Sequence, residues 1–405
     1  MLAAPPLSEA LGKVNGFGLL RLLLAVSVIF AHAMPLGMGK GDPGATWSRG
    51  QTGLGAVAVA GFFVLSGLLI TRSGLRLTAA RFLWNRAIRI LPAFWVCLLV
   101  TAFVVAPLVA RHEHLLGTFW SHPEGPWEYI KANWTVGVDQ WTISGLMAHN
   151  LKGGAFNGSI WSLAYEVLCY LVVAALAAVG VLQRMRWAVV AAMAALYGYM
   201  IYLAVGYPHL RAPGYGPTAL PDWRLPLLGS ISMDKLLPLV LMFGLGALAE
   251  LYKSRLRMNG VAALLSLVLF VGSARYGGFS VIGLPAFAYL LIWLAAYMPH
   301  PLTKVGTKVD LSYGVYIYAF PIQQGLALLQ VPRHGYAAYT GAAVVLSVVA
   351  AFLSWHMVEK PALKLKNVRL PRQSRGDRNR PTNGSAEAGL PAPKSPAAAA
   401  GRLSG

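Results

Sequence analysis

The feature of this sequence that most limits its possible folds is a series of apolar stretches, most of them about 20 residues long. A helix rises 1.5 Å per residue, so it needs roughly 20 apolar residues to cross the hydrocarbon core of a bilayer. Hydrophobic residues make up 57% of the chain and charged residues only 12%, about half the share found in soluble domains. The sequence therefore predicts an all-α, polytopic transmembrane bundle, because open sheets would leave backbone groups unpaired in lipid.

We expect about ten spans, and the distribution of charge between them predicts their orientation. Lys and Arg gather in every second loop and in the C-terminal tail, and the positive-inside rule places such segments in the cytoplasm. Both termini are therefore expected on the cytoplasmic side of a plasma membrane, the bacterial inner membrane. The expected spans lie near 17–37, 53–71, 88–109, 160–181, 187–205, 233–250, 259–274, 279–298, 311–330 and 336–356.

The N-terminus has a competing interpretation. Lys13, the apolar stretch after it and the triplet Ala31-His32-Ala33 imitate a secretory signal with its cleavage site. Arg21 interrupts the apolar core of that segment, however. Cleavage would also leave nine spans, so that the alternation of basic loops would no longer agree with a cytoplasmic placement. We therefore expect this segment to remain as the first span.

The expected organisation is a short cytoplasmic N-terminus at 1–16, a transmembrane domain at 17–361 and a basic tail at 362–405. The tail is rich in Pro, Gly and Ala and is predicted to be disordered, because it is too polar to pack a core. The net charge of +20 lies in the loops and this tail, so it indicates contact with membrane lipid and no nucleic-acid partner. Both cysteines, Cys97 and Cys169, lie in apolar runs without metal-ligand spacing, so no metal site is expected.

Ionisable residues inside the expected spans are candidates for function, because charge is costly in lipid. Arg21 and His32 are eleven residues apart, close to three helical turns, so they share one face of the first span. Glu166 is expected roughly 9 Å below the outer start of the fourth span, and His32 about 8 Å from the outer end of the first. The two are thus predicted at similar depth, where a carboxylate would raise the basicity of the imidazole and His32 would act as a base.

Each of these residues also has a structural interpretation. Arg21 suits a snorkelling anchor, His32 an interfacial hydrogen bond to a neighbouring helix, and Glu166 an ion pair or a hydrogen bond. Arg86 and Arg89 follow one another at i, i+3 near the cytoplasmic start of the third span. Two guanidiniums on one helix face can cradle phosphates, although ordinary positive-inside charge explains them as well.

Six short motifs follow one another along the chain in an order that resembles the acyltransferase-3 family of membrane O-acyltransferases. They are R-x10-H at Arg21 to His32, GFFVLSG at 61–67, RAIRILP at 86–92, SIWSLAYE at 159–166, LSYGVY at 311–316 and VEKP at 358–361. Each motif is weak alone, but the ordered set spans nearly all of the expected transmembrane domain.

The resemblance implies transfer of an acyl group, usually acetyl, from cytoplasmic acetyl-CoA to a hydroxyl of an extracytoplasmic polysaccharide or glycolipid, such as exopolysaccharide or lipopolysaccharide. It implies His32 as the catalytic base, supported by Glu166, and Arg21, Arg86 and Arg89 as ligands of the coenzyme phosphates. The acceptor contacts that it implies are Trp161, Ser162, Tyr313, Tyr316 and Gln323. The His that often follows S-Y-G-x-Y in this family is replaced by Ala319, so its role is absent here or passes to Tyr318, Gln323 or Gln324.

Two other functions compete with this interpretation. A transporter or flippase for a sugar or a lipid-linked glycan also suits charged residues within spans, but transporters tend to have paired halves, and no repeat is found. A scaffold or receptor would leave the shared face of Arg21 and His32 without a purpose. The motifs are compatible with acetyl, succinyl or another acyl group, and with direct transfer or a covalent enzyme intermediate.

Overall fold

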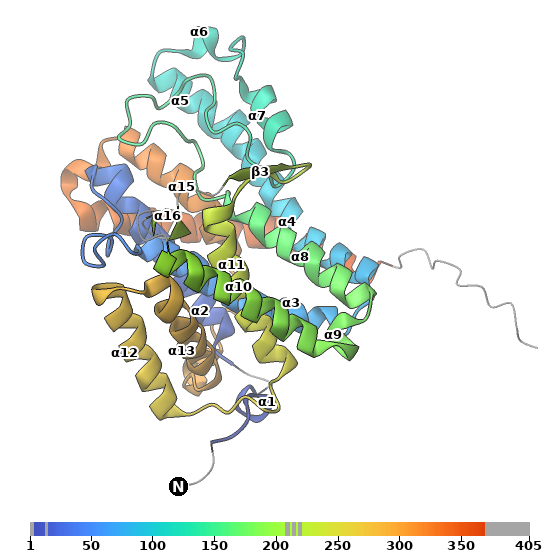
Figure 1. Cartoon of the computed structure of the whole chain (residues 1–405). Helices are drawn as coiled ribbons and strands as arrows, with labels where there is room; N and C mark the ends of the chain where they lie inside the picture. Colours follow the sequence, from blue (N-terminus) through green and yellow to red (C-terminus); the bar gives the residue numbers. More distant parts are fainter. Residues whose placement is uncertain (1–3, 13–14, 207–210, 213–215, 218–220, 369–405) are drawn as a thin grey trace, which may run out of the picture. The chain divides into compact units, whose positions relative to one another are not determined.

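The computed structural model describes residues 4–12, 15–206, 211–212, 216–217 and 221–368, and most of these residues are helical (Figure 1). A helix occupies each of the ten stretches predicted as spans. These helices are α2 (Phe17–Ala33), α3 (Leu54–Gly74), α4 (Ala79–Val100), α8 (Ser162–Ala178), α10 (Arg186–Gly206), α11 (Met233–Leu251), α12 (Gly260–Tyr276), α13 (Leu284–Ala296), α15 (Ser312–Leu328) and α16 (Tyr336–Ser354).

Several of these helices continue through π-helical segments, and short elements fill the loops. The π-helical segments are η1 (Met34–Met38), η2 (Thr101–Val105), η4 (Phe279–Gly283) and η6 (Trp355–Glu359). The short α-helices are α1 (Leu7–Ala10), α5 (Ala106–His112), α6 (Leu116–Phe119), α7 (Pro126–Asn133), α9 (Val181–Arg184), α14 (His300–Thr303) and α17 (Lys360–Lys364), and the 3-10 turns are η5 (Val331–His334) and η7 (Leu365–Asn367). Two antiparallel strand pairs, which the sequence did not predict, join β1 (Arg211–Ala212) to β2 (Gly216–Pro217) and β3 (Asp222–Leu225) to β4 (Gly229–Ser232).

Six helical segments in the described part of the chain are long and apolar enough to cross a membrane. They are Phe17–Met38, Leu54–Gly74, Ala79–His112, Arg186–Gly206, Phe279–Ala296 and Tyr336–Lys364. The helices α8 and α12 are apolar but have only 17 residues each. The predicted helical architecture is therefore confirmed with these six candidate spans, whereas ten spans remain a prediction.

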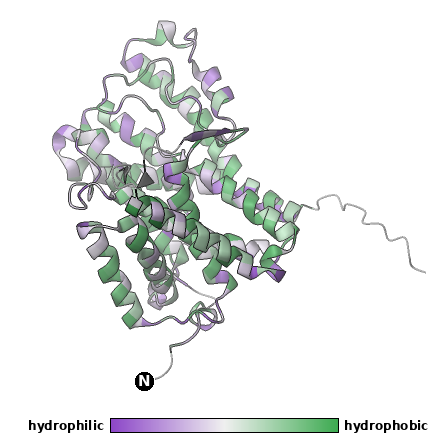
Figure 2. Cartoon of the chain, in the orientation of Figure 1, coloured by the Kyte–Doolittle hydropathy of each residue, from purple (hydrophilic) through white to green (hydrophobic). Residues whose placement is uncertain are grey.

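The exposed surface of the long helices is apolar. Leu264 and Val268 on α12, and Val345 and Val349 on α16, each expose half or more of their surface. Figure 2 shows hydrophobic residues along the long helices and hydrophilic residues gathered mainly in the loops. In water such a surface would be unfavourable, and a surrounding bilayer accounts for it.

The predicted tail begins later than the sequence suggested. Residues 362–367, which composition assigned to a disordered segment, form the end of α17 and the turn η7. The remainder of that predicted tail, residues 369–405, lies outside the described residues.

Glycines allow α3 and α11 to approach each other at backbone distance. A Cβ added to Gly67 would lie 1.9 Å from the carbonyl oxygen of Phe243, and one added to Gly246 would lie 2.0 Å from that of Val64. Small residues at helix crossings of this kind are the usual basis of packing within membranes, where lipid is as apolar as leucine. Since α3 also lines the candidate site, this crossing holds one wall of the site in place.

Substituting Gly67 with Ala should destabilise the protein, because the added methyl group meets a carbonyl oxygen that cannot rotate away. We expect Gly67→Ala to cost about 1–3 kcal/mol of unfolding free energy, the range typical of overpacking. The matched control is Gly272→Ala on α12, where an added Cβ meets no atom within 4 Å. Thermal unfolding in detergent should give a lower Tm for Gly67→Ala only, and equal Tm values would contradict the close crossing.

Candidate active site

Two adjoining cavities contain most of the polar residues predicted to act in the site. The first, the arginine cavity, has a volume of about 90 Å³ and is lined by residues that include Arg21, Ser66, Arg86, Arg89, Glu166 and Tyr313. The second, the histidine cavity, has a volume of about 360 Å³ and is lined by residues that include His32, Asp42, Thr52, Trp161 and Lys235. Val59 and Tyr316 line both cavities, so the two meet at these side chains.

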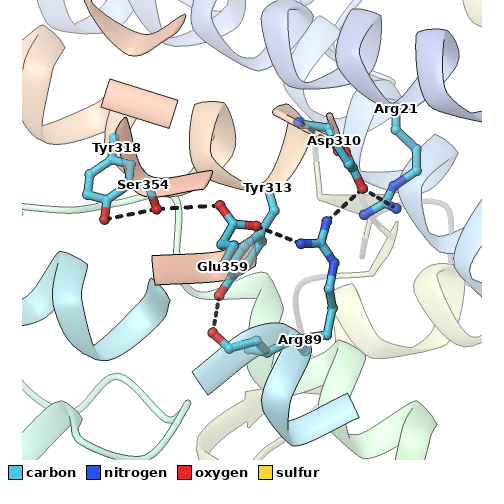
Figure 3. Close-up of polar contacts among 9 residues, drawn as sticks. Arg21, Arg89, Asp310, Tyr313, Tyr318, Ser354 and Glu359 are labelled. Atoms are coloured by element: carbon cyan, nitrogen blue, oxygen red, sulfur yellow. Dashed lines mark hydrogen bonds and ion pairs between the residues drawn. The ribbon is translucent and has the colours of Figure 1, made fainter. Parts of the chain in front are cut away.

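Arg89 is the centre of a buried ion-pair network. Its two terminal nitrogens lie 2.6 Å from Asp310 and 2.6 Å from Glu359. Arg21 approaches the same carboxylate of Asp310 from α2, at 3.1 Å (Figure 3). The network thus joins α2 and α4 to Asp310, two residues before α15, and to Glu359 at the end of η6.

Asp310 keeps its negative charge because its partners outweigh its burial. Burial on its own would raise the pKa of Asp310, but the charges of Arg21 and Arg89, together with two hydrogen bonds from Ser312, lower it to about 2. The backbone N–H and the hydroxyl of Ser312 both donate to Oδ1, so Oδ2 is left for the two arginines. Asp310 therefore acts as a fixed anion at the start of α15.

Arg86 differs from Arg89 although both belong to one predicted phosphate cradle. Arg86 forms no ion pair with any residue that the structure describes, and its buried Nε has no hydrogen-bond partner. Its side chain lines the arginine cavity. Of the two arginines, Arg86 is consequently the one that is available to bind an anionic ligand.

Glu166 lies in the arginine cavity and accepts hydrogen bonds within it. The hydroxyl of Ser66 donates to Oε1 of Glu166 at 2.7 Å, and the hydroxyl of Tyr170 donates to the same oxygen. The arginine cavity therefore combines this hydrogen-bonded carboxylate with the unpaired guanidinium of Arg86.

The expectation that Glu166 and His32 lie at the same depth is corrected by the structure. A Cβ added to Gly55 would lie 3.2 Å from the Cβ of Ala31. Because His32 follows Ala31 directly, it lies level with the start of α3. Glu166 instead bonds to Ser66, eleven residues further along α3, which corresponds to roughly 16 Å.

The reason for this offset is the path of the chain before α8. Asn157 and Ser159 are already buried, and the hydroxyl of Tyr316 donates to the carbonyl of Ser159. The segment thus enters the bundle before the helix begins, so Glu166 lies deeper than a helix starting at the membrane surface would place it.

His32 lies at the end of α2, where its ring has packing contacts but a free nitrogen. The ring meets Phe320 edge-on with 5.1 Å between centroids, and the buried Nδ1 has no hydrogen-bond partner among the described residues. One turn earlier, Gln323 donates from Nε2 to the carbonyl of Ile29 at 2.9 Å. The helix is therefore held from α15 while the imidazole remains available to the histidine cavity.

Two charged residues that the sequence analysis did not select also line the histidine cavity. Asp42 accepts hydrogen bonds from the backbone N–H groups of Leu54 and Gly55, so it caps the start of α3. Burial raises the pKa of Asp42, and these two bonds only partly offset that rise. Lys235 places its ammonium 4.9 Å from the ring centroid of Trp161. This cavity therefore holds an imidazole, a carboxylate, an ammonium and an aromatic surface.

The residues predicted to bind the acceptor divide among three places. Trp161 lines the histidine cavity, Ser162 and Tyr313 line the arginine cavity, and Tyr316 lines both. The hydroxyl groups of Ser162 and Tyr316 share a hydrogen bond of 2.7 Å. Gln323 lines neither cavity, since it is fully buried and bonded to α2, so its expected role as an acceptor contact is corrected to a structural one.

Sequence signals existed for some of the residues that were missed. Asp310 lies two residues before the S-Y-G-x-Y motif, Glu359 belongs to the E-K-P motif, and Ser66 belongs to the second-span motif. Their partners could not be read from the motifs, because each partner lies on a distant helix. Asp42 and Lys235 lie in loop and helix-start positions where a charged residue is ordinary, so no motif identified them.

Comparisons with known proteins agree along almost the whole chain. A family model described as an acyltransferase domain, acyltransferase-3, matches residues 14–356. The O-acetyl transferase of Shigella phage Sf6 is 27% identical over 363 residues, which cover 88% of this chain and 98% of the relative. Nodulation protein 10 of Rhizobium leguminosarum bv. viciae is 26% identical over 386 residues, which cover 89% of this chain and 96% of the relative. No solved structure matches the chain significantly.

Removing the charge of Asp310 should destabilise the fold, because Arg21 and Arg89 would lose their shared partner. We expect Asp310→Asn to lower the unfolding free energy by roughly 3 kcal/mol, as breaking a buried ion pair does. The pKa of Asp310 is lowered from 3.8 to about 2, so its contribution is complete above about pH 4 and is lost as the pH falls through 2.

Thermal unfolding in detergent tests this expectation at two pH values. The Tm difference between Asp310→Asn and the wild type should be the same at pH 5 and pH 7. Asp139→Asn is the control, because Asp139 forms an exposed ion pair with Arg224, and such pairs contribute about 1 kcal/mol or less. A difference that halves between pH 7 and pH 5 would show that Asp310 is not held ionised.

Proposed function

This chain belongs to the acyltransferase-3 family and is a multi-pass membrane O-acyltransferase, and we propose that it transfers an acetyl group from cytoplasmic acetyl-CoA to a hydroxyl of an extracytoplasmic polysaccharide or glycolipid. The observation that carries the proposal is the pair of adjoining cavities, one with an unpaired arginine and the other with an unpaired imidazole. The name of the phage relative, an O-acetyl transferase, supports acetyl as the acyl group.

Arg86 is the proposed main contact of the donor phosphates. In the buried network Arg21 and Arg89 are already paired with Asp310 and Glu359, so they supply little net charge. Arg86 keeps its hydrogen-bond donors free, and hydrogen bonds from guanidinium to phosphate are among the stronger kinds in proteins. This revises the expected cradle of three arginines to one binding arginine and two that hold the fold.

The size of the arginine cavity limits what it can contain. Its volume of about 90 Å³ is well below the roughly 300–1,000 Å³ of sites that hold a small molecule. A nucleotide does not fit, so we propose that the nucleotide remains at the mouth and that the thioester arm passes the side chains of Val59 and Tyr316. Glu166, bonded to Ser66 and Tyr170, would position this arm or Arg86 rather than assist His32.

The histidine cavity is the proposed acceptor site. Its volume of about 360 Å³ is within the range of small-molecule sites, roughly 300–1,000 Å³. His32 would take the proton of the acceptor hydroxyl while its oxygen attacks the thioester carbonyl. The new C–O bond replaces the C–S bond, and the proton then passes from His32 to the departing thiolate. Trp161 offers an aromatic face beside this site.

The orientation proposed for this reaction follows the charge of the loops. Arg72 and Arg76 near the end of α3, and Arg81 near the start of α4, lie at the end of the bundle where the arginine cavity is found. The positive-inside rule makes that end cytoplasmic, which is where acetyl-CoA is available. Ten spans in the inner membrane, with both termini in the cytoplasm, complete the proposal. A transporter or a scaffold would not account for membership in an acyltransferase family.

Replacing His32 should abolish transfer without unfolding the protein. General-base catalysis typically contributes 10²- to 10⁴-fold, so we expect His32→Ala to lower the rate at least about 100-fold. The measurement is radiolabel transferred from acetyl-CoA to glycan in membrane vesicles, with Tm as a check on folding. The control is His334→Ala, since His334 is exposed in η5. Full activity in the His32 variant would defeat the catalytic assignment.

Replacing Arg86 and replacing Arg89 should give different defects. Arg86→Gln removes an unpaired guanidinium, so we expect the apparent KM for acetyl-CoA to rise about tenfold while Tm changes little. Arg89→Gln removes two buried ion pairs, so we expect its main effect to be a lower Tm. Arg111→Gln on α5 is the exposed control. A KM that is unchanged in Arg86→Gln would remove this residue from the donor site.

A further inference from the structure

The helices α3 and α11 are parallel neighbours, and their contacts fix the level of each residue along α11. At their close crossing, Gly67 of α3 meets the carbonyl of Phe243 of α11. Further along both helices, Arg72 pairs with Glu250 at 2.8 Å, so the two helices run in the same direction. A residue that precedes Phe243 on α11 therefore lies level with one that precedes Gly67 by the same number of positions on α3.

Lys235, near the start of α11, lies level with the place where the two cavities meet. Phe243 follows Lys235 by eight residues. Gly67 follows Val59 by the same number, so Lys235 is level with Val59. Both residues line the histidine cavity together with His32, and Val59 also lines the arginine cavity. The ammonium of Lys235 is thus in the same cavity as the proposed base, at its border with the donor side.

The ring of Trp161 holds the ammonium of Lys235 in this part of the cavity. The nitrogen lies 4.9 Å from the ring centroid, a distance at which a cation is attracted to an aromatic face. Trp161 directly precedes Ser162, whose hydroxyl shares a hydrogen bond of 2.7 Å with that of Tyr316. Tyr316 is the second side chain that lines both cavities. The register of α11 and the contact with Trp161 therefore place Lys235 at the same border.

Lys235 carries a charge that the described residues do not neutralise. None of the ion pairs among these residues includes Lys235. Asp42 lines the same cavity, but both of its oxygens accept hydrogen bonds from backbone N–H groups at the start of α3. A charge inside an apolar bundle is costly, which makes it a candidate for function. Lys235 is therefore suited to a negative charge that forms in this cavity.

The proposed transfer creates such a charge. When the acceptor oxygen attacks the thioester carbon, an electron pair of the C=O bond moves onto the carbonyl oxygen, and it returns as the C–S bond breaks. His32 handles the proton of the acceptor and does not neutralise this oxygen. The hydroxyl of Tyr316 donates its one proton to the carbonyl of Ser159, so Ser162 donates to Tyr316. Neither hydroxyl is free to donate to the substrate, whereas the ammonium of Lys235 is.

We propose that the ammonium of Lys235 donates a hydrogen bond to the carbonyl oxygen of the acetyl group as this oxygen becomes negatively charged, which makes Lys235 a catalytic residue of the transfer. Lys235 gives up no proton and acts by electrostatic stabilisation, to which a donor held in place before the reaction contributes most. The inference rests on the proposed function, because it takes acetyl-CoA as the donor and His32 as the base.

Steady-state kinetics of the purified full-length chain in detergent test this role. The assay follows radiolabel from acetyl-CoA to polysaccharide and glycolipid that are extracted from the producing cells and deacetylated with alkali. We expect Lys235→Met to lower kcat about 100-fold, as the loss of one oxyanion donor does, with little change in the KM of either substrate. Lys235→Arg keeps the charge and should retain most of kcat. The control is Lys131→Met, because Lys131 is exposed in α7.

The contrary results are distinct from one another. An unchanged kcat in Lys235→Met, with a wild type that transfers acetyl groups, would overturn the role of Lys235 and leave the proposed function in place. A raised KM for the extracted glycan with an unchanged kcat would overturn it in favour of a contact with an acidic acceptor. An equal loss of Tm and kcat in the Met and Arg variants would show a structural role. A wild type that transfers no acetyl group would overturn the proposed function and this inference together.

A change of one atom in the donor tests the contact itself. In a dithioester analogue of acetyl-CoA, sulfur replaces the carbonyl oxygen, and sulfur is a weak hydrogen-bond acceptor. The wild type should lose more of its rate on this replacement than Lys235→Met, which has no ammonium left to lose its partner. Equal losses in the two proteins would show that Lys235 does not contact the reacting carbonyl, and the proposal would be overturned.

Discussion

The guanidinium of Arg89 is the element on which the arrangement of the site depends. It lies between the carboxylates of Asp310 and Glu359, and Arg21 shares Asp310 with it. A charge placed in an apolar bundle is stabilised only if its partners have the correct geometry, and it is strongly destabilising when one is lost. The start of α2, α4, the approach to α15 and the end of η6 therefore have to meet at one point. Both cavities are built on helices fixed by this meeting.

The same network explains how two arginines one helical turn apart have different roles. Arg89 lies 5.7 Å from the ring centroid of Tyr313 and 5.8 Å from that of Trp355, and its terminal nitrogens are taken by carboxylates. Arg86 has no such partners and lines the cavity. In the proposed reaction, Arg89 would therefore not compete for the donor, and Arg86 would be the guanidinium that meets its phosphate.

Hydropathy predicted the helices well because membrane helices are long and apolar, and each of the ten expected stretches is helical. Periodicity did not predict that α4 begins at Ala79, where Thr78 caps it, instead of near residue 88. The candidate site residues were selected because ionisable groups in apolar runs are conspicuous. Their pairing was not predictable, since the depth of Glu166 depends on the buried path of Asn157 and Ser159 before α8, and such a path has no sequence period.

The separation of Glu166 from His32 by roughly 16 Å along α3 is consistent with a reaction whose two substrates come from opposite sides of a membrane. A single wide channel joining them would also let water and ions pass, and water would hydrolyse the thioester. Among the residues that the structure describes, only Val59 and Tyr316 line both cavities, and Tyr316 is fixed by Ser159 and Ser162. A thin acyl arm can pass such a contact, whereas a nucleotide or a glycan cannot. In the proposed reaction, the packing around Tyr316 thus keeps the donor and the acceptor on their own sides while the acyl group crosses.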